Sequence, residues 1–395
     1  MNKPQRLHSL DNLRGIMMWL GIVVHASVCY MTGPAPTPWR DSQTSLLADL
    51  LIVFIHAFRM PVFFMLAGFF VSMLLARRGT QAMLQQRIRR LVWPFLVFWP
   101  LLFASMVVLI AIYAHLRAYD TVGIDFALIP QVPGRPAIPL LHLWFIYYLF
   151  LFCLLLALIT YLTIYLPASF KNSFMAMWKS LAVKWWACAV LALPLALTGA
   201  FYRGGIVTPS GSFIPDIAEF IHSGMYFMSG IFLYQFQTDL LEIYIQRRWA
   251  NLIAGLLILV IFLGISKNFE TAQATLFSLK MAMAFLYNCV SWLWSFALIG
   301  LFLKYLPAQN RGLAYIADSS YWVYIVHLPL TIVSAILLYH SPFGAPTRLA
   351  CNIALTTVVC LLSYQLLVRH SFIGRFLNGS KSSDNLPEQS LAANS

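Results

Sequence analysis

Long apolar runs separated by short polar segments make up most of the chain. Ten of these runs approach the length of about 20 residues that an α-helix needs to cross a bilayer. They cover residues 13–32, 47–75, 91–114, 139–165, 181–200, 216–236, 251–266, 273–303, 319–339 and 348–368. The pattern predicts an all-α, polytopic integral membrane protein with about ten transmembrane helices. The short seventh span and the long eighth could each be re-entrant, or split near Asn288 and Ser291.

The predicted helices form one domain followed by a tail. Residues 1–376 are predicted to be a single transmembrane domain, and the polar, aromatic-free residues 377–395 a disordered cytoplasmic tail. The first apolar run is longer than a signal-peptide core, so we expect it to be retained as a helix. The outer loop 115–138 is long and rich in proline, including Pro130 and Pro133, and is predicted to be a substrate-facing rim.

The composition excludes several other classes of protein. Hydrophobic residues make up 61% of the chain and charged residues only 10%, where a soluble domain would carry about a quarter charged. This excludes a soluble enzyme, and the many aromatic residues exclude a disordered or collagen-like chain. All six cysteines lie inside apolar runs and no histidines are clustered in the sequence, so neither a disulfide framework nor a metal site is expected.

The distribution of positive charge predicts the orientation in the membrane. If the N-terminus is inside, 17 of the 26 Lys and Arg lie in cytoplasmic segments, six in outer segments and three within spans. Cytoplasmic segments are the ones enriched in Lys and Arg, so both termini are predicted to be cytoplasmic. The same rule accounts for the net charge of +13, and no nucleic-acid partner is expected.

Four ionisable side chains are predicted near the bilayer midplane: His25, His56, Arg59 and His327. Counted at about 1.5 Å per residue, His25 lies roughly 18 Å from the inner edge of the apolar core and the others at a similar level. No Asp or Glu reaches this depth, although a proton-coupled transporter would normally place one there. Each histidine alone could be a polar contact between helices, but together the four side chains suit a general base and an anionic ligand.

Two further groups of residues are candidates for substrate contacts. Near the inner surface the arginines are Arg14, Arg77, Arg78, Arg87, Arg89 and Arg90. The five in the loop could follow from the positive-inside rule and lipid contact, or they could hold the phosphates of a cytosolic donor. At the outer end of the fourth span, Trp144 fits an aromatic belt, whereas His142 beside it fits a sugar-facing mouth.

Several of these residues stand in the order and spacing of a known family. The chain resembles the membrane acyltransferase-3 family in Arg14 followed by ten residues and His25, in His56-Ala-Phe-Arg59 followed by Phe63-Phe64 and Gly68, and in the run from Arg87 to Pro94. Two later stretches, His142-Leu-Trp144-Phe145 and Tyr324-Ile-Val-His327-Leu-Pro329-Leu, are similar to one branch, the succinyltransferases of osmoregulated periplasmic glucans. The resemblance spans nearly the whole chain, although 166–310 carries little that is diagnostic.

The resemblance implies a multi-pass enzyme of the bacterial inner membrane. Such an enzyme moves a succinyl group from cytosolic succinyl-CoA, its co-substrate, to hydroxyls of periplasmic glucans, with no permanently bound cofactor. His25 takes the family's histidine as general base, Arg14 its arginine, and Arg87, Arg89 and Arg90 its donor-binding run. Roles for the remaining residues rest on position: His56, Arg59 and His327 in catalysis, Arg77 and Arg78 in donor binding, and His142 and Trp144 on the acceptor side.

Arg59 is expected to bind the succinyl carboxylate or the developing oxyanion, and no acidic partner of His25 is identified.

Three alternatives to this function remain open at this point, as does the oligomeric state. The protein could be an O-acetyltransferase acting on lipopolysaccharide or exopolysaccharide. It could transport an anionic solute, although the inverted repeats and interrupted helices of many transporters are not found. A pure scaffold would have no need to bury Arg59 and three histidines.

Overall fold

The computed structural model describes residues 3–33, 39–129, 136–269, 276–308 and 310–378, and within these ranges every regular element is helical. The α-helices are α1 (Lys3–Val28), α2 (Leu46–Arg87), α3 (Trp93–Tyr119), α4 (Trp144–Leu162), α5 (Ala168–Ala182), α6 (Ala187–Gly199), α7 (Ile217–Gln235), α8 (Gln237–Phe269), α9 (Phe277–Tyr305), α10 (Arg311–Leu338), α11 (Ala345–Ser363) and α12 (Phe372–Asn378). Two short elements also matter for the site: the π-helix η1 (Ile88–Val92) and the 3-10 helix η3 (Leu141–Leu143).

The number of membrane crossings depends on how the helices are counted. In the described part of the chain, six helices are long and apolar enough to span a membrane, or seven if the bent pair α5 and α6 forms one span. One of the six is the run Leu46–Tyr119, whose 74 residues contain two predicted spans. Every predicted span overlaps a different helix, but α1 and α7 do not meet this criterion. The all-α polytopic fold is confirmed, and the count of ten crossings stays a prediction.

The fifth predicted span overlaps α6, which meets the preceding α5 at a bend of 106°. The seventh and eighth spans, which could each have been re-entrant or split, lie in single helices. The seventh lies within α8, and the eighth is α9, which passes through both polar residues. It remains intact because Asn288 Nδ2 donates to Ala284 O and Ser291 Oγ donates to Tyr287 O, so both side chains find partners one turn back.

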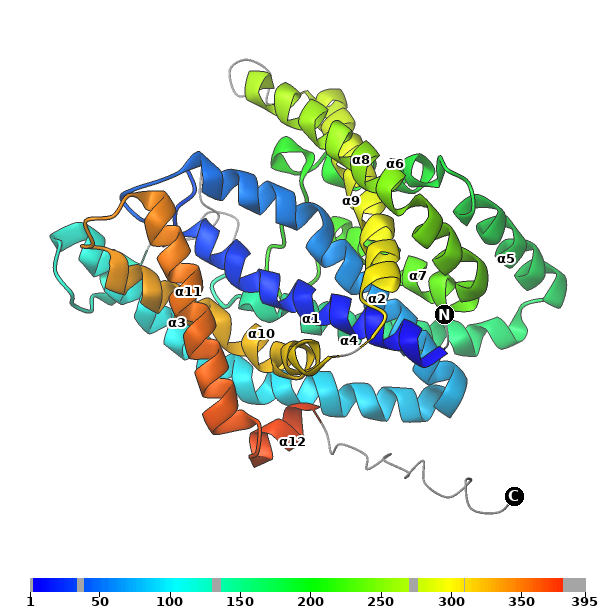
Figure 1. Cartoon of the computed structure of the whole chain (residues 1–395), viewed down its shortest axis with the longest axis horizontal. Helices are drawn as coiled ribbons and strands as arrows, with labels where there is room; N and C mark the ends of the chain where they lie inside the picture. Colours follow the sequence, from blue (N-terminus) through cyan, green and yellow to red (C-terminus); the bar gives the residue numbers. More distant parts are fainter. Residues whose placement is uncertain (1–2, 34–38, 130–135, 270–275, 309, 379–395) are drawn as a thin grey trace.

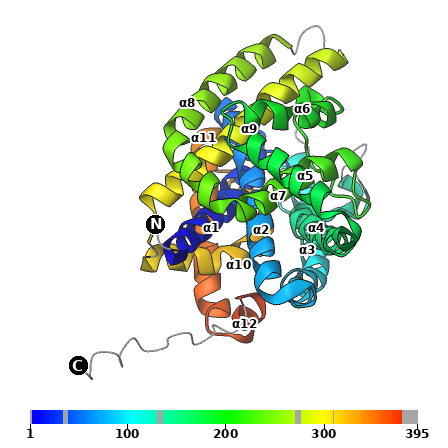
Figure 2. The same cartoon turned by 90° about the vertical axis from the view of Figure 1, so that its right-hand side faces the viewer.

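Helix α1 lies in the middle of the molecule, packed between α2 and α10 (Figure 1). Helix α2 also packs against α7, and two glycines let α2 and α7 approach closely. A Cβ atom at Gly68 would collide with the carbonyl oxygen of Phe227, and one at Gly230 with that of Met65. Helices α8 and α9 lie side by side and extend away from this centre (Figure 2). Helices α1, α2, α7 and α10 therefore form the frame of the interior.

The boundary expected at residue 377 lies inside α12. Leu377 is buried, and its carbonyl oxygen accepts a hydrogen bond of 2.6 Å from Arg90 Nη1. Residues 379–395 of the expected tail lie outside the described residues, as do Pro130 and Pro133 of the expected outer rim. Leu377 therefore belongs with the folded domain.

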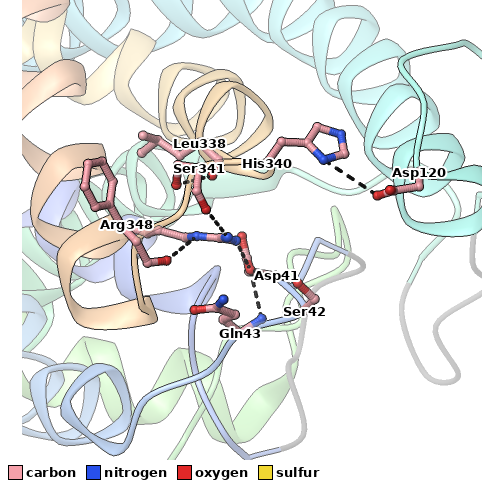
Figure 3. A network of polar contacts seen from close by, with 9 residues as sticks. Asp41, Ser42, Gln43, Asp120, Leu338, His340, Ser341 and Arg348 are labelled. Carbon is pink, nitrogen blue, oxygen red and sulfur yellow. Dashed lines mark hydrogen bonds and ion pairs between the residues drawn. The ribbon is translucent and has the colours of Figure 1, made fainter.

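A buried ion pair ties the segment after α1 to the start of α11 (Figure 3). Arg348 Nη1 lies 2.9 Å from Asp41 Oδ1, and Nε and Nη2 donate to the carbonyl oxygens of Phe343 and Ser341. The Arg348 side chain is 5% exposed and that of Asp41 is fully buried. Burial raises the pKa of Asp41, and the charge of Arg348 opposes that shift. The guanidinium therefore offsets part of the cost of burying this carboxylate.

We expect Arg348→Met to lower the free energy of unfolding by about 3–5 kcal/mol at neutral pH, because it leaves Asp41 buried without its cation. Since the pKa of Asp41 is then raised further in the folded state, the folded state binds a proton more readily than the unfolded chain, and stability returns as the pH falls. Thermal denaturation in detergent at neutral and mildly acidic pH measures both effects. Arg311→Met, at an exposed arginine, is the control; an equal loss in both variants would contradict a role for the pair.

Candidate active site

Three histidine rings from three different elements meet in the interior. His25 comes from α1, His142 from η3 and His327 from α10. The ring centroid of His25 lies 5.0 Å from that of His327 and 6.2 Å from that of His142, and the last two are 5.1 Å apart. His142 and His327 are almost fully buried, with 6% and 1% exposed. We call these three residues the histidine cluster.

The backbone of α10 fixes which nitrogen of His327 carries the proton. His327 Nδ1 lies 2.9 Å from the carbonyl oxygen of Val323 and 2.8 Å from that of Tyr324. A carbonyl oxygen only accepts hydrogen bonds, so Nδ1 is the donor and Nε2 of the neutral ring carries a lone pair. Nε2 is buried and has no hydrogen-bond partner among the described residues. His327 therefore presents a fixed basic nitrogen to its surroundings.

A proline in α10 supplies the partner of His142. Pro329 has no N–H, so the carbonyl oxygen of Ile325, four residues earlier, loses its helical donor. His142 Nε2 lies 3.0 Å from that oxygen and takes the vacant place. Tyr324 Oη donates in return to His142 O at 2.7 Å. Nε2 of His142 is thus the donor, and its buried Nδ1, which has no partner in the described chain, carries the lone pair.

Arg59 is the charged member of the site. It is 9% exposed, and no acidic side chain or other hydrogen-bond partner of its guanidinium is found among the described residues. Gly21 of α1 makes room for it: a Cβ atom there would lie 3.6 Å from Arg59 Nη2 and 3.1 Å from His327 Nε2. A buried guanidinium without an anion is costly, so this geometry suits an anionic ligand.

Two members of the histidine cluster, His25 and His142, line a cavity together with Arg59, and we call it the central cavity. Trp144 and Tyr324 also line it. His25 is only half-buried, whereas His327 lies behind it. The central cavity therefore offers a ligand the accessible imidazole of His25 and the guanidinium of Arg59.

A second cavity, the outer cavity, shares Trp144 and Met60 with the first. It is lined by His56 of α2, by Glu219 and His222 of α7, and by Asn288 of α9. It lies toward the predicted outer side, because Glu219 and His222 are in the first turns of α7, whose N-terminus is predicted to be outside.

Sequence reasoning did not select Glu219, His222 or Asn288 as site residues. A usable signal existed, since His222 and Asn288 are polar side chains inside predicted spans.

Two predicted site residues lie in unexpected places. His56 was expected beside His25; it lies within electrostatic range of His25, but its side chain lines the outer cavity, where its Nδ1 is buried and has no partner in the described chain. His142 was expected at an outer mouth, but it belongs to the histidine cluster. The reason is η3, which carries His142 into the interior before α4 begins, with Leu141 in the left-handed region at a φ of 55°. Trp144 stands between the two cavities instead of at the surface.

The six candidate donor arginines divide into two groups. Arg14, Arg87 and Arg90 lie close enough for their charges to repel one another, although Arg14 also pairs with Asp11 at 3.2 Å. Arg77, Arg78 and Arg89 are exposed. The three clustered arginines come from α1, the end of α2 and the π-helix η1, an irregularity that often marks a functional site. We call Arg14, Arg87 and Arg90 the inner arginines.

No group of His, Cys, Asp and Glu in the described part of the chain has the geometry to hold a metal ion.

Comparison with known proteins identifies relatives along almost the full length. The family described as "Acyltransferase domain" matches residues 7–365. The proteins named "Glucans biosynthesis protein C" from Escherichia coli O81 (strain ED1a) and from Escherichia coli O157:H7 are each 24% identical to the chain over 380 residues, which cover 92% of this chain and 92% of theirs. No solved structure matches the chain.

We expect a thermodynamic coupling between His142 and Pro329. The variant His142→Phe leaves the Ile325 carbonyl oxygen unpaired, which should cost about 1–3 kcal/mol. Pro329→Ala restores the missing backbone donor, so the double variant should be less destabilised than the two single effects predict, by about 1 kcal/mol. Thermal or denaturant unfolding of the four proteins measures the coupling. Pro194→Ala, inside α6, is the matched control; equal coupling for both prolines would refute the assignment.

Proposed function

This chain belongs to the membrane acyltransferase family, and from that premise we propose that it transfers an acyl group from cytosolic acyl-CoA to a hydroxyl of a glycan on the outer side of the bacterial inner membrane. One observation carries the proposal: the unpaired guanidinium of Arg59 and the accessible imidazole of His25 line the same buried cavity. Thioester acyl transfer to a hydroxyl needs a base for the hydroxyl proton and positive charge for the carbonyl oxygen.

In the proposed reaction, His25 takes the proton of the acceptor hydroxyl while its oxygen attacks the thioester carbonyl. The new C–O bond forms, the C–S bond breaks, and the proton held by His25 passes to the departing CoA thiolate. Of the described residues, the charged or titratable side chains that act on His25 are those of His327, Arg59, His142 and His56, and none is a carboxylate.

Arg59 favours a succinyl group over an acetyl group as the cargo. A succinyl group carries its own carboxylate, which a forked guanidinium binds well, and Arg59 has no other anion among the described residues. The name of the relatives adds support for a glucan acceptor. The second candidate is an O-acetyltransferase acting on another surface glycan, in which Arg59 would face only the developing oxyanion.

The inner arginines are the proposed site for the phosphates of the acyl-CoA donor. Arg87 lies within electrostatic range of Arg14 and Arg90, and Arg87 Nε is buried without a partner in the described chain. Three mutually repelling cations are stabilised by a polyanion. The thin pantetheine arm would then extend from this site toward His25, and no permanently bound cofactor takes part.

We expect His25→Ala to reduce acyl transfer about 10²- to 10⁴-fold, the usual contribution of a general base. Inside-out membrane vesicles loaded with glucan and supplied with labelled succinyl-CoA would report ester formation, and acetyl-CoA in the same vesicles would test the second candidate. His370→Ala, at an exposed histidine, is the control. Transfer at the wild-type rate by the His25 variant would exclude it as the base.

We expect Arg87→Gln to weaken binding of CoA about tenfold or more, because a charged hydrogen bond to phosphate is lost. The matched change Arg89→Gln, one of the exposed arginines of the same segment, should have little effect. Stabilisation of the detergent-solubilised protein by CoA in thermal denaturation measures the difference. If Arg89→Gln weakened binding as much as Arg87→Gln, general surface charge and not the inner arginines would hold the donor.

A further inference from the structure

We propose that the outer cavity binds an uncharged polyhydroxyl ring, a sugar unit of the acceptor, and that His222, Asn288 and Tyr226 recognise its hydroxyl groups. The inference rests on the proposed function, since it names the acceptor site of that reaction. None of these three residues belongs to the chemistry assigned to the histidine cluster.

The position of the outer cavity suits the acceptor. Met60 and Trp144 line both cavities, so a ligand in the outer cavity lies against the wall of the one that holds His25. The segment Ile206, Val207 and Pro209, which precedes α7 on the predicted outer side, also lines it. A ring between this segment and Trp144 would hold one hydroxyl toward the central cavity, and the apolar face of a sugar packs well on an indole.

The polar lining of the outer cavity offers hydrogen-bond acceptors in fixed positions. Asn288 Oδ1 receives hydrogen bonds from His222 Nε2 and from Tyr226 Oη, each at 3.1 Å. His222 Nε2 is therefore the donor, and Nδ1 of its neutral ring is an acceptor. Asn288 is itself held in place, because its Nδ2 donates to Ala284 O at 2.8 Å. This network would accept hydroxyl hydrogens without rearranging, which lowers the entropic cost of binding.

His56 adds an unsatisfied group to the same cavity. Its Nδ1 is buried and has no hydrogen-bond partner in the described part of the chain. An unpaired buried nitrogen costs free energy that a ligand hydroxyl would recover. His56 is three residues before Arg59 on α2. Because His56 lines the outer cavity and Arg59 the central one, this turn of α2 borders both cavities.

The charges of the two cavities differ, and the difference selects the ligand. No Lys or Arg is among the described residues that line the outer cavity, whereas Arg59 lines the central one. The acidic side chain of the outer cavity, Glu219, is held by Ser210 N, Tyr148 Oη and Tyr202 Oη. An anionic ring would be repelled by this carboxylate, and no cation in the lining would offset the repulsion. The outer cavity therefore favours a neutral ring, and Arg59 in the central cavity remains the proposed anion-binding residue.

The test compares variants of the full-length protein in nanodiscs, with cellopentaose as the neutral acceptor probe and succinyl-CoA as donor. His222→Phe keeps the ring and removes both nitrogens, so the KM for cellopentaose should rise about tenfold, as expected for one lost neutral hydrogen bond in a binding site. Trp144→Ala should raise it by a similar factor. The KM for succinyl-CoA should stay unchanged in His222→Phe, because His222 lines only the outer cavity, whereas Trp144 also lines the central one. Matched controls are His370→Phe and Trp185→Ala, at exposed positions.

Two further measurements make each outcome decisive. In calorimetry without donor, cellopentaose in which the primary hydroxyls are oxidised to carboxylates should bind at least tenfold more weakly; equal binding of both would overturn the assignment to a neutral ring. Calorimetric binding of cellopentaose without donor tests the cavity independently of catalysis. If wild type binds it and His222→Phe binds equally well, this inference fails. If binding is weakened in the variant as expected but wild type transfers no acyl group, the proposed function fails and the binding site stands.

Discussion

The carbonyl oxygen of Ile325 is the point on which the interior depends. Pro329 removes its helical donor, and a membrane interior offers no water to replace that donor. His142 therefore comes in from η3 to fill the vacancy, and the strained left-handed conformation of Leu141 is held by that contact. Once His142 is fixed there, its ring lies against those of His25 and His327. A missing backbone hydrogen bond thus assembles side chains from three elements into one cluster.

The two buried arginines show how the same physics yields two different roles. Arg348 has an anion and two carbonyl oxygens around its guanidinium, so its charge is satisfied and it joins two segments of the chain. Arg59 is buried to a similar degree, yet the described chain provides it with no anion. The free energy of burying a charge has to be recovered from some partner. For Arg348 the partner is part of the protein, and for Arg59 we propose that it arrives with a ligand.

The sequence was informative wherever a single helix carried the signal. Hydropathy located the helices, and the depth of His25, Arg59 and His327 correctly brought those three residues together. It could not place His142, because the path of η3 is set by the proline in α10, far away along the chain. It also could not tell that His56 and Arg59 line different cavities, since residues three apart on a helix share a face and only the neighbouring helices separate them. The outer cavity needs α2, α7 and α9 at once, and apolar periodicity contains no information on which helices become neighbours.

The wall of Trp144 and Met60 has a consequence for the membrane as an insulator. A cavity of polar groups on the outer side and a basic cluster in the middle, with cations at the inner end, would together make a path for protons and small ions if they were continuous. Such a leak would be harmful in a bacterial inner membrane, because it would dissipate the electrochemical potential in which the cell stores energy. Met60 and Trp144 line both cavities, so these two side chains lie between them. Any motion that brings acceptor and donor together has to move that partition only while substrates themselves fill the gap.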